Sequence, residues 1–345
     1  MSSNTGATVL YDTLADRRTL AKILLGFVVA GLLVYLLAAV VGFGAIRQAF
    51  ARADPRWLAL ACLSTLVGLV AWTKAWQVVL SVVGIEVPFR RLVVTYLSGT
   101  FANYITPFGQ AGGEPFIAFV LAQDTESSYE DSLAGVVIAD LLNLLPFFNF
   151  AALGLATLLV SARLPAIIRP LAYGLTALAI AIPVIAYLGW NHREVVEAWT
   201  IRLLRPFLRR TSRVTVTGVR QRIDRFYTSL EVIAAEPREL AYALVFSYAG
   251  WLFFALPLYV SALTLGYHIA PMVVLFIVPA STIAGFVPTP GGLASVETAL
   301  VVLLVALTAL SANQAFALAM VYRLSSYWFA LAVGGGATLW VIFRS

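Results

Sequence analysis

Five ionisable side chains stand inside otherwise apolar stretches of this 345-residue chain: Lys74, Glu114, Asp140, Glu297 and Arg323. An ionised group in the hydrocarbon of a bilayer costs at least about 2.5–3.5 kcal/mol on insertion scales, so such residues are functional candidates by default. Two of them are basic and three are acidic, and pairing would neutralise most of the charge and lower the cost of burial. We therefore expect a network among these residues.

Glu114 follows the first of two breaks rich in proline and glycine, Thr106-Pro107-Phe108-Gly109-Gln110-Ala111-Gly112-Gly113-Glu114-Pro115. Pro115 suits the first turn of a helix, where its missing N–H would be unpaired in any case. Gly112 and Gly113 let the backbone bend tightly and approach a ligand closely. A helix that begins here points free N–H groups and a partial positive charge into the break, which suits a phosphate. The sequence leaves open whether Glu114 serves such a site or only complements the dipole of its own helix.

The second break repeats this construction in Pro288-Thr289-Pro290-Gly291-Gly292-Leu293-Ala294-Ser295. We expect Ser295 or a glycine to cap the helix that follows, with Glu297 in its first turn. A capping role alone would account for Glu297. The occurrence of the same construction twice favours a ligand site.

The other candidates lie in uninterrupted apolar stretches. Asp140 is placed to relay a proton, to pair with a cation or to hold irregular backbone through hydrogen bonds. Arg323 is a natural partner for a carboxylate or a lipid phosphate, because a guanidinium binds both in bidentate fashion. Lys74 is expected to extend its amine toward the membrane interface.

The elements that position these residues are membrane helices. Hydrophobic residues make up 61% of the chain and charged residues only 12%, against about 25% charge in soluble domains. The net charge of +6 does not indicate nucleic-acid binding, because the basic residues cluster in loops beside apolar spans, a pattern of anionic-lipid contact. Cys62 is the only cysteine, which excludes a disulfide framework and a cysteine-based metal site.

About 20 apolar residues cross the hydrocarbon core as a helix. We predict an all-α polytopic membrane protein with six full transmembrane helices, at 21–44, 57–83, 133–160, 167–189, 240–266 and 314–342. The stretches 92–122 and 271–309 contain the two breaks, so we predict that each forms a re-entrant hairpin of two half-helices. Irregular backbone at membrane depth is tolerated only against protein or a water-filled cavity, and the breaks are therefore expected to mark the functional centre.

The spans and breaks follow the same order twice. Within a single membrane domain of residues 1–345, a first half (17–160) and a second half (167–344) start from opposite faces, an inverted repeat typical of transporters with a site near the midplane. The segment 191–239 carries ten arginines, which places it and both termini on the cytoplasmic side of the cell membrane. Its apolar residues recur at helical spacing, as in a helix that lies in the interface. A basic linker is the alternative.

The sequence lacks the common motifs of enzyme active sites and nucleotide-binding loops. The chain has no His-Glu-x-x-His, Gly-x-Ser-x-Gly or P-loop pattern, each of which carries a defined catalytic or nucleotide-binding mechanism. We therefore expect neither an enzyme nor a cofactor or metal.

The breaks also carry a resemblance. Asn103-Tyr104-Ile105-Thr106-Pro107, followed by Gly112-Gly113-Glu114-Pro115, resembles the first signature of the lysylphosphatidylglycerol synthase transmembrane-region family of flippase-like membrane proteins. The run from Pro288 to Glu297 resembles its second signature, and Arg323 matches the arginine usual in the last span.

The chain departs from many members at Ile117, Val136 and Val137, where those members carry charged residues. The resemblance implies lipid translocation or the handling of lipid-linked precursors. It does not imply lipid aminoacylation, for which we expect no domain here.

From these observations we expect a flippase that moves an anionic phospholipid or a polyprenyl-phosphate-linked lipid through a polar cavity near the midplane. The residues expected to bind the substrate are Asn103, Gly112, Gly113, Glu114, Asp140, Pro290, Gly291, Gly292, Glu297 and Arg323. Alternatives are an intramembrane transferase or hydrolase acting on a lipid-linked substrate, a non-catalytic membrane partner of a separately encoded glycosyltransferase or other lipid-modifying enzyme, and a proton-coupled carrier of small solutes. The partners expected are membrane lipids, with no nucleic acid.

Overall fold

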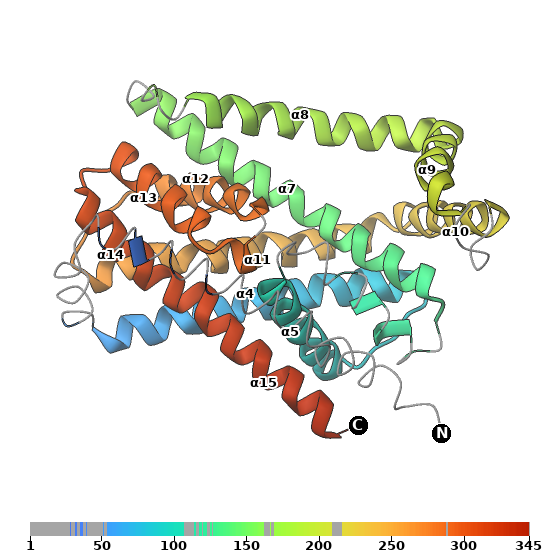
Figure 1. The fold of residues 1–345 in the computed structure, drawn as a ribbon, viewed down its shortest axis with the longest axis horizontal. Helices are drawn as coiled ribbons and strands as arrows, with labels where there is room; N and C mark the ends of the chain where they lie inside the picture. The colour runs from blue at the N-terminus through green and yellow to red at the C-terminus, as the bar shows by residue number, and fades with distance from the viewer. Residues whose placement is uncertain are drawn as a thin grey trace.

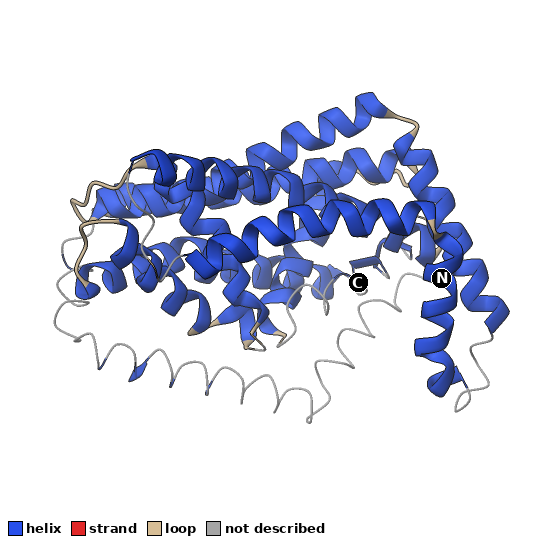
Figure 2. Ribbon diagram, turned by 90° about the horizontal axis from the view of Figure 1, so that it is seen from above, coloured by secondary structure: helices blue, strands red, loops and turns tan. Residues whose placement is uncertain are grey.

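The computed structural model describes residues 28, 32, 35–36, 39, 51, 54–106, 114, 117–118, 120–122, 125, 127–161, 166, 169–208, 216–287 and 289–344. These residues form helices joined by loops and turns, without a strand among them (Figures 1 and 2). Most of the predicted span 21–44 lies outside the described residues, as do Gly112 and Gly113 of the first break and Pro288 of the second.

The long helices account for most of the chain. Their bounds are α4 (Pro55–Val82), α5 (Phe89–Ile105), α7 (Tyr129–Ser161), α8 (Arg169–Asn191), α9 (Arg193–Leu208), α10 (Val216–Ala234), α11 (Pro237–Thr264), α12 (Pro271–Thr282), α13 (Ser295–Leu307), α14 (Ala312–Arg323) and α15 (Phe329–Arg344). Short turns η1 (Ile283–Phe286) and η2 (Pro290–Gly292) link α12 to α13, and a π-helical turn η3 (Leu324–Trp328) joins α14 to α15.

Six segments of the described chain are long and apolar enough to cross a membrane. They are Pro55–Val82, Tyr129–Val160, Arg169–Asn191, Pro237–Thr264, Pro290–Leu307 and Ala312–Val341. Five of them match predicted spans, which confirms an all-helical polytopic membrane protein. The sixth, Pro290–Leu307, was predicted as part of a hairpin. Its neighbour α12 has 12 residues, about 18 Å at 1.5 Å per residue and short of the ~30 Å core. The re-entrant course of 92–122 and 271–309 stays a prediction, as does the inverted repeat.

Several helices begin at local signals in the sequence. The side chain of Asp54 accepts a hydrogen bond from the Arg56 amide, with Pro55 at the first helical position of α4. Ser311 and Gln314 form a reciprocal capping box at the start of α14. Such caps satisfy amides that the helix itself leaves without partners.

Small residues bring the central helices close together. Helices α4 and α11 pack along each other through the middle of the molecule (Figure 1), where Ser64 Oγ donates to the Phe253 carbonyl at 2.7 Å. A Cβ atom on Gly68 of α4 would lie 3.1 Å from the Gly250 carbonyl of α11. On α15, a Cβ atom on Gly334 would lie 2.5 Å from the Leu97 carbonyl of α5. Close backbone approach of this kind is how helices associate where the hydrophobic effect gives no driving force.

Helix α9 turns sharply across the end of α8 at the right of Figure 1, and α10 continues beyond it. Helices α9 and α10 are joined by an ion pair between Glu197 and Arg220, with Oε1 and Nε 2.5 Å apart. The hydroxyl of Tyr227 on α10 donates to the Gly189 carbonyl of α8 at 2.8 Å. The described parts of the predicted amphipathic segment are therefore helical, as α9 and α10, and α9 lies across the direction of α8 (Figure 1).

Candidate functional site

The second break is a tight, left-handed bend that only small residues fit. Gly291 and Gly292 have φ angles of 56° and 64°, a region that glycine enters freely. A Cβ atom on Gly291 would lie 2.0 Å from the ring of Tyr327, and one on Gly292 would lie 2.7 Å from Gly285 Cα. Both glycines are therefore required by conformation and by space.

The cap of α13 differs from the prediction. The N-cap is Ala294, at φ 70° and ψ −41°, and no side chain caps the helix. Ser295 instead donates from Oγ to the Gly292 carbonyl at 2.9 Å. The prediction that Ser295 or a glycine caps α13 is wrong, whereas Glu297 does fall in the first turn. A non-glycine residue in this region costs on the order of 1–3 kcal/mol and is held where the surroundings over-determine it, often at a functional site.

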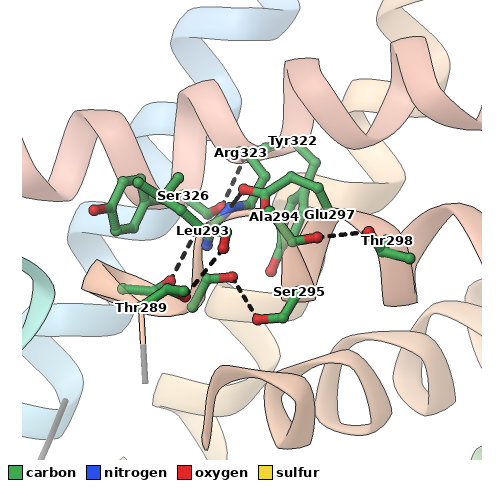
Figure 3. A network of polar contacts seen from close by, with 12 residues as sticks. Thr289, Leu293, Ala294, Ser295, Glu297, Thr298, Tyr322, Arg323 and Ser326 are labelled. Atoms are coloured by element: carbon green, nitrogen blue, oxygen red, sulfur yellow. Dashed lines mark hydrogen bonds and ion pairs between the residues drawn. The ribbon is translucent and has the colours of Figure 1, made fainter. Parts of the chain in front are cut away.

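Arg323 and Glu297 form a buried ion pair at this bend. Arg323 Nε donates to Glu297 Oε1 at 2.6 Å, and Arg323 Nη2 donates to the Gly291 carbonyl at 3.0 Å. Figure 3 shows Arg323 reaching from α14 to Glu297 at the start of α13. Glu297 is 1% exposed and Arg323 is 8% exposed. The second carboxylate oxygen, Glu297 Oε2, is buried and has no hydrogen-bond partner among the described residues.

The π-helical turn η3 begins directly after Arg323. Turns of this type are rare and occur frequently at functional sites. The guanidinium of Arg323 lies 4.2 Å from the ring centroid of Tyr327, in the range of a cation–π interaction. Arg323 and Tyr327, four residues apart, therefore meet the same bend, one at the Gly291 carbonyl and one beside its Cα.

The end of α5 reaches the same place from the other half of the chain. The rings of Tyr104 and Tyr327 lie 4.9 Å apart, and the Tyr327 hydroxyl donates to the Tyr104 carbonyl at 3.3 Å. The preceding residue, Asn103, has a buried Oδ1 atom without a hydrogen-bond partner among the described residues. The chain leading into the first break therefore lies against the second break, as a shared centre requires.

Asp140 and Glu114 form a second polar cluster. Trp76 Nε1 donates to Asp140 Oδ1 at 3.1 Å, and the carboxyl groups of Glu114 and Asp140 lie close enough to interact electrostatically. No cation pairs with Asp140 in the part of the chain that the structure describes. Two carboxyl groups this close favour a shared proton, since two adjacent negative charges repel each other.

The expected network of five ionisable residues is therefore divided. Arg323 pairs with Glu297, and Glu114 pairs with Asp140. Lys74 lies apart from both, with its amine 2.7 Å from Gln77 Oε1 and 5.5 Å from the ring centroid of Phe89. A single network was the wrong expectation, although the pairing of Arg323 with a carboxylate is confirmed.

Three residues of these clusters were not among the predicted site residues. Tyr327 follows Arg323 by four residues, and this spacing puts both on one helix face, so periodicity was an available signal. Tyr104 lies inside the first signature. Trp76 has no distinguishing signal, because its indole meets Asp140 only through the packing of α4 against α7.

The chemistry available follows from these groups. Arg323 offers a planar set of N–H donors suited to phosphate, and the carboxyl groups offer proton exchange. Among the described residues, no group of three or more His, Cys, Asp or Glu side chains is placed to hold a metal ion.

Comparison with known proteins gives one family. The model of the family described as "Lysylphosphatidylglycerol synthase TM region" matches residues 23–334. A "UPF0104 membrane protein" of Methanothermobacter thermautotrophicus is 25% identical over 302 residues, which cover 86% of this chain and 89% of that protein. The "UPF0104 membrane protein PH1989" of Pyrococcus horikoshii is 25% identical, over 82% of this chain and 87% of that one. The chain matches no solved structure.

Proposed function

Since the chain belongs to the lysylphosphatidylglycerol synthase transmembrane-region family, we propose that it moves a phosphate-bearing lipid across the membrane. The substrate is an anionic phospholipid or a polyprenyl-phosphate-linked lipid. The observation that carries the proposal is the buried Arg323, held at the bend before α13 by Glu297 and the Gly291 carbonyl. An arginine inside a membrane bundle is costly and is retained for substrate or ion recognition.

The phosphate binds between Arg323 and the start of α13. The first amides of a helix have no partners within the helix and carry a partial positive charge, and no side chain caps them here. Arg323 adds a formal positive charge and a planar donor set. Together they replace part of the hydration that a headgroup loses when it leaves the leaflet surface.

The acyl or prenyl chains stay in lipid during transfer. Only the polar headgroup then needs a protein environment, which limits the site to the small polar region around Arg323, Tyr104 and Asn103. The arginine-bearing helix α9 rests on the cytoplasmic leaflet of the cell membrane, where basic residues attract anionic lipid.

Reconstitution of the purified chain into sealed liposomes tests this proposal. A fluorescent phosphatidylglycerol or polyprenyl-phosphate sugar is placed in both leaflets, and the fraction accessible to an external quencher is followed over time. Wild-type protein should raise the accessible fraction above one half. Arg323→Ala should abolish the rise, whereas Lys74→Met, which removes a cation outside both clusters, should preserve it. Equal rates for wild type and Arg323→Ala would refute the role of Arg323.

A second function is favoured by the other cluster. Glu114 and Asp140 face each other beside Trp76, and one carboxylate of such a pair is a suitable general base. An intramembrane transferase or hydrolase acting on a lipid-linked substrate would use it. Product formed in detergent, where no sealed compartment exists, and lost in Asp140→Asn would establish this activity in place of transport.

A further inference from the structure

Glu297 occupies the position that an anionic headgroup needs. Its Oε1 atom takes the Nε donor of Arg323, and Glu297 is one of the most deeply buried polar residues of the described chain, at 1% exposure. A phosphate that reaches Arg323 must therefore share the guanidinium with this carboxylate.

The charge balance at the site decides how the phosphate and Glu297 share the Arg323 guanidinium. Arg323 and Glu297 together are neutral, and a bound phosphodiester would leave the buried site with one net negative charge. Burial of an unbalanced charge is strongly unfavourable, and a protein commonly avoids it by neutralising the group with a proton. A proton on Glu297 restores neutrality, and the phosphate then becomes the counter-ion of Arg323.

The unused carboxylate oxygen gives this proton a place. Glu297 Oε2 is buried without a hydrogen-bond partner among the described residues, which costs free energy in the substrate-free state. Once Oε2 carries the proton, it becomes a donor and can hydrogen-bond a phosphate oxygen. Phosphate binding thereby gives Glu297 Oε2 the hydrogen-bond partner that it lacks in the substrate-free protein.

No other group at the site offers the same exchange. The titratable side chains that face the pair are Tyr322 of α14, Tyr327 of η3 and Tyr104 of α5, and a tyrosine that is already protonated cannot accept this proton. Helix α12, which packs on α13, carries no ionisable residue between Pro271 and Thr282. Glu297 is the carboxylate that contacts Arg323 directly among the described residues, which makes it the acceptor for this proton.

We propose that Glu297 is the resident counter-ion of Arg323 and takes up one proton when a lipid phosphate binds, so that headgroup and proton are bound together. The proposal rests on the proposed lipid transport and adds the proton to it. The proton comes from solvent and forms an O–H bond at Oε2, while the phosphate oxygens accept hydrogen bonds from Arg323 and from that O–H. Binding is therefore stronger at lower pH, since the bound state holds one more proton than the free state.

Calorimetry on the full chain in detergent tests the inference. Dihexanoylphosphatidylglycerol and farnesyl phosphate serve as separate probes, each titrated in buffers of different ionisation enthalpy, so that the buffer dependence of the heat counts protons taken up. We expect about one proton per bound phosphatidylglycerol at neutral pH, and affinity that falls up to about tenfold per pH unit while Glu297 is ionised in the free protein. Glu297→Gln should bind with no proton uptake and no such pH dependence. Glu130→Gln, which removes an acid at the start of α7, should retain both.

The outcomes separate this inference from the function beneath it. Wild-type protein that binds and transports lipid without proton uptake would overturn the inference and leave lipid transport standing. Proton uptake by Glu297→Gln equal to that of wild type would also overturn the inference and leave lipid transport standing. If neither probe binds and liposomes show no transport, the proposed function fails as well. Should Glu297→Gln not fold, the proton count of wild type still decides, and Glu297→Asp should keep the uptake.

Discussion

The buried ion pair between Arg323 and Glu297 supports a quantitative prediction about stability. Arg323→Met removes the guanidinium and leaves the Glu297 carboxyl group 1% exposed and without a partner for either oxygen among the described residues. Breaking a buried pair in this way costs about 3–5 kcal/mol of unfolding free energy. Glu297→Leu leaves Arg323 unbalanced in the same manner and is expected to cost a similar amount.

The double variant Arg323→Met/Glu297→Leu should behave differently. Replacing both ions with apolar groups of similar volume is often neutral. Here the Gly291 carbonyl also loses the hydrogen bond from Nη2, so we expect the double variant within about 2 kcal/mol of wild type. The coupling energy between the two sites is then at least about 4 kcal/mol.

Unfolding in mixed micelles with increasing SDS, followed by circular dichroism, measures all four proteins under one condition. Lys74→Met serves as the control, because Lys74 contacts Gln77 of its own helix and its loss should cost less than about 1 kcal/mol. Additive effects of the two single substitutions would refute the reasoning. So would an Arg323→Met variant as stable as wild type.

Three further predictions concern the bend and the surface. Gly291→Ala should destabilise the protein by about 2–5 kcal/mol, because the new Cβ would lie 2.0 Å from the Tyr327 ring in left-handed backbone. Gly174→Ala is the control, because a Cβ atom there has no other atom within 4 Å. Equal unfolding curves for the two variants would contradict the prediction. Tyr327→Phe removes the hydroxyl bond to the Tyr104 carbonyl and should cost about 0.5–1.5 kcal/mol in the same SDS titration, with the ring still packed; a loss as large as that of Gly291→Ala would show that the hydroxyl has another role. The third prediction uses a Cys62→Ser background with a fluorophore on Leu203→Cys of α9, whose native side chain is 67% exposed. Vesicles that contain anionic lipid should shield this fluorophore from an aqueous quencher, whereas a fluorophore on Glu194→Cys should stay accessible. Equal quenching at the two positions would place α9 away from the membrane.

The sequence predicts the helical architecture well, and physics explains why. Lipid requires every backbone group to be satisfied within a segment, so an apolar run of sufficient length has few alternatives to a helix. Five predicted spans accordingly match described helices. The pairing of Arg323 with a carboxylate is predictable for the same reason, because a lone charge at that depth is too costly to keep.

The local details of the site are less accessible to sequence. The left-handed Ala294 that begins α13 contradicts the intrinsic preference of alanine and is imposed by its tertiary surroundings. Asp140 meets a tryptophan and another carboxyl group instead of a cation, which depends on how α4 and α7 pack. Charge balance alone does not select which carboxylate Arg323 takes.

The central claim is that Arg323 receives the phosphate of a lipid during its transfer across the membrane. Its most direct measurement compares two fluorescent lipids in the same proteoliposomes, phosphatidylglycerol and a diacylglycerol of equal chain length that lacks the phosphate. Because unassisted diacylglycerol exchange is fast, the quantity compared is the protein-dependent increment over empty liposomes. We predict an increment for phosphatidylglycerol that disappears in the Arg323→Met/Glu297→Leu variant, and none for diacylglycerol. An increment for phosphatidylglycerol that survives in this variant would contradict the account.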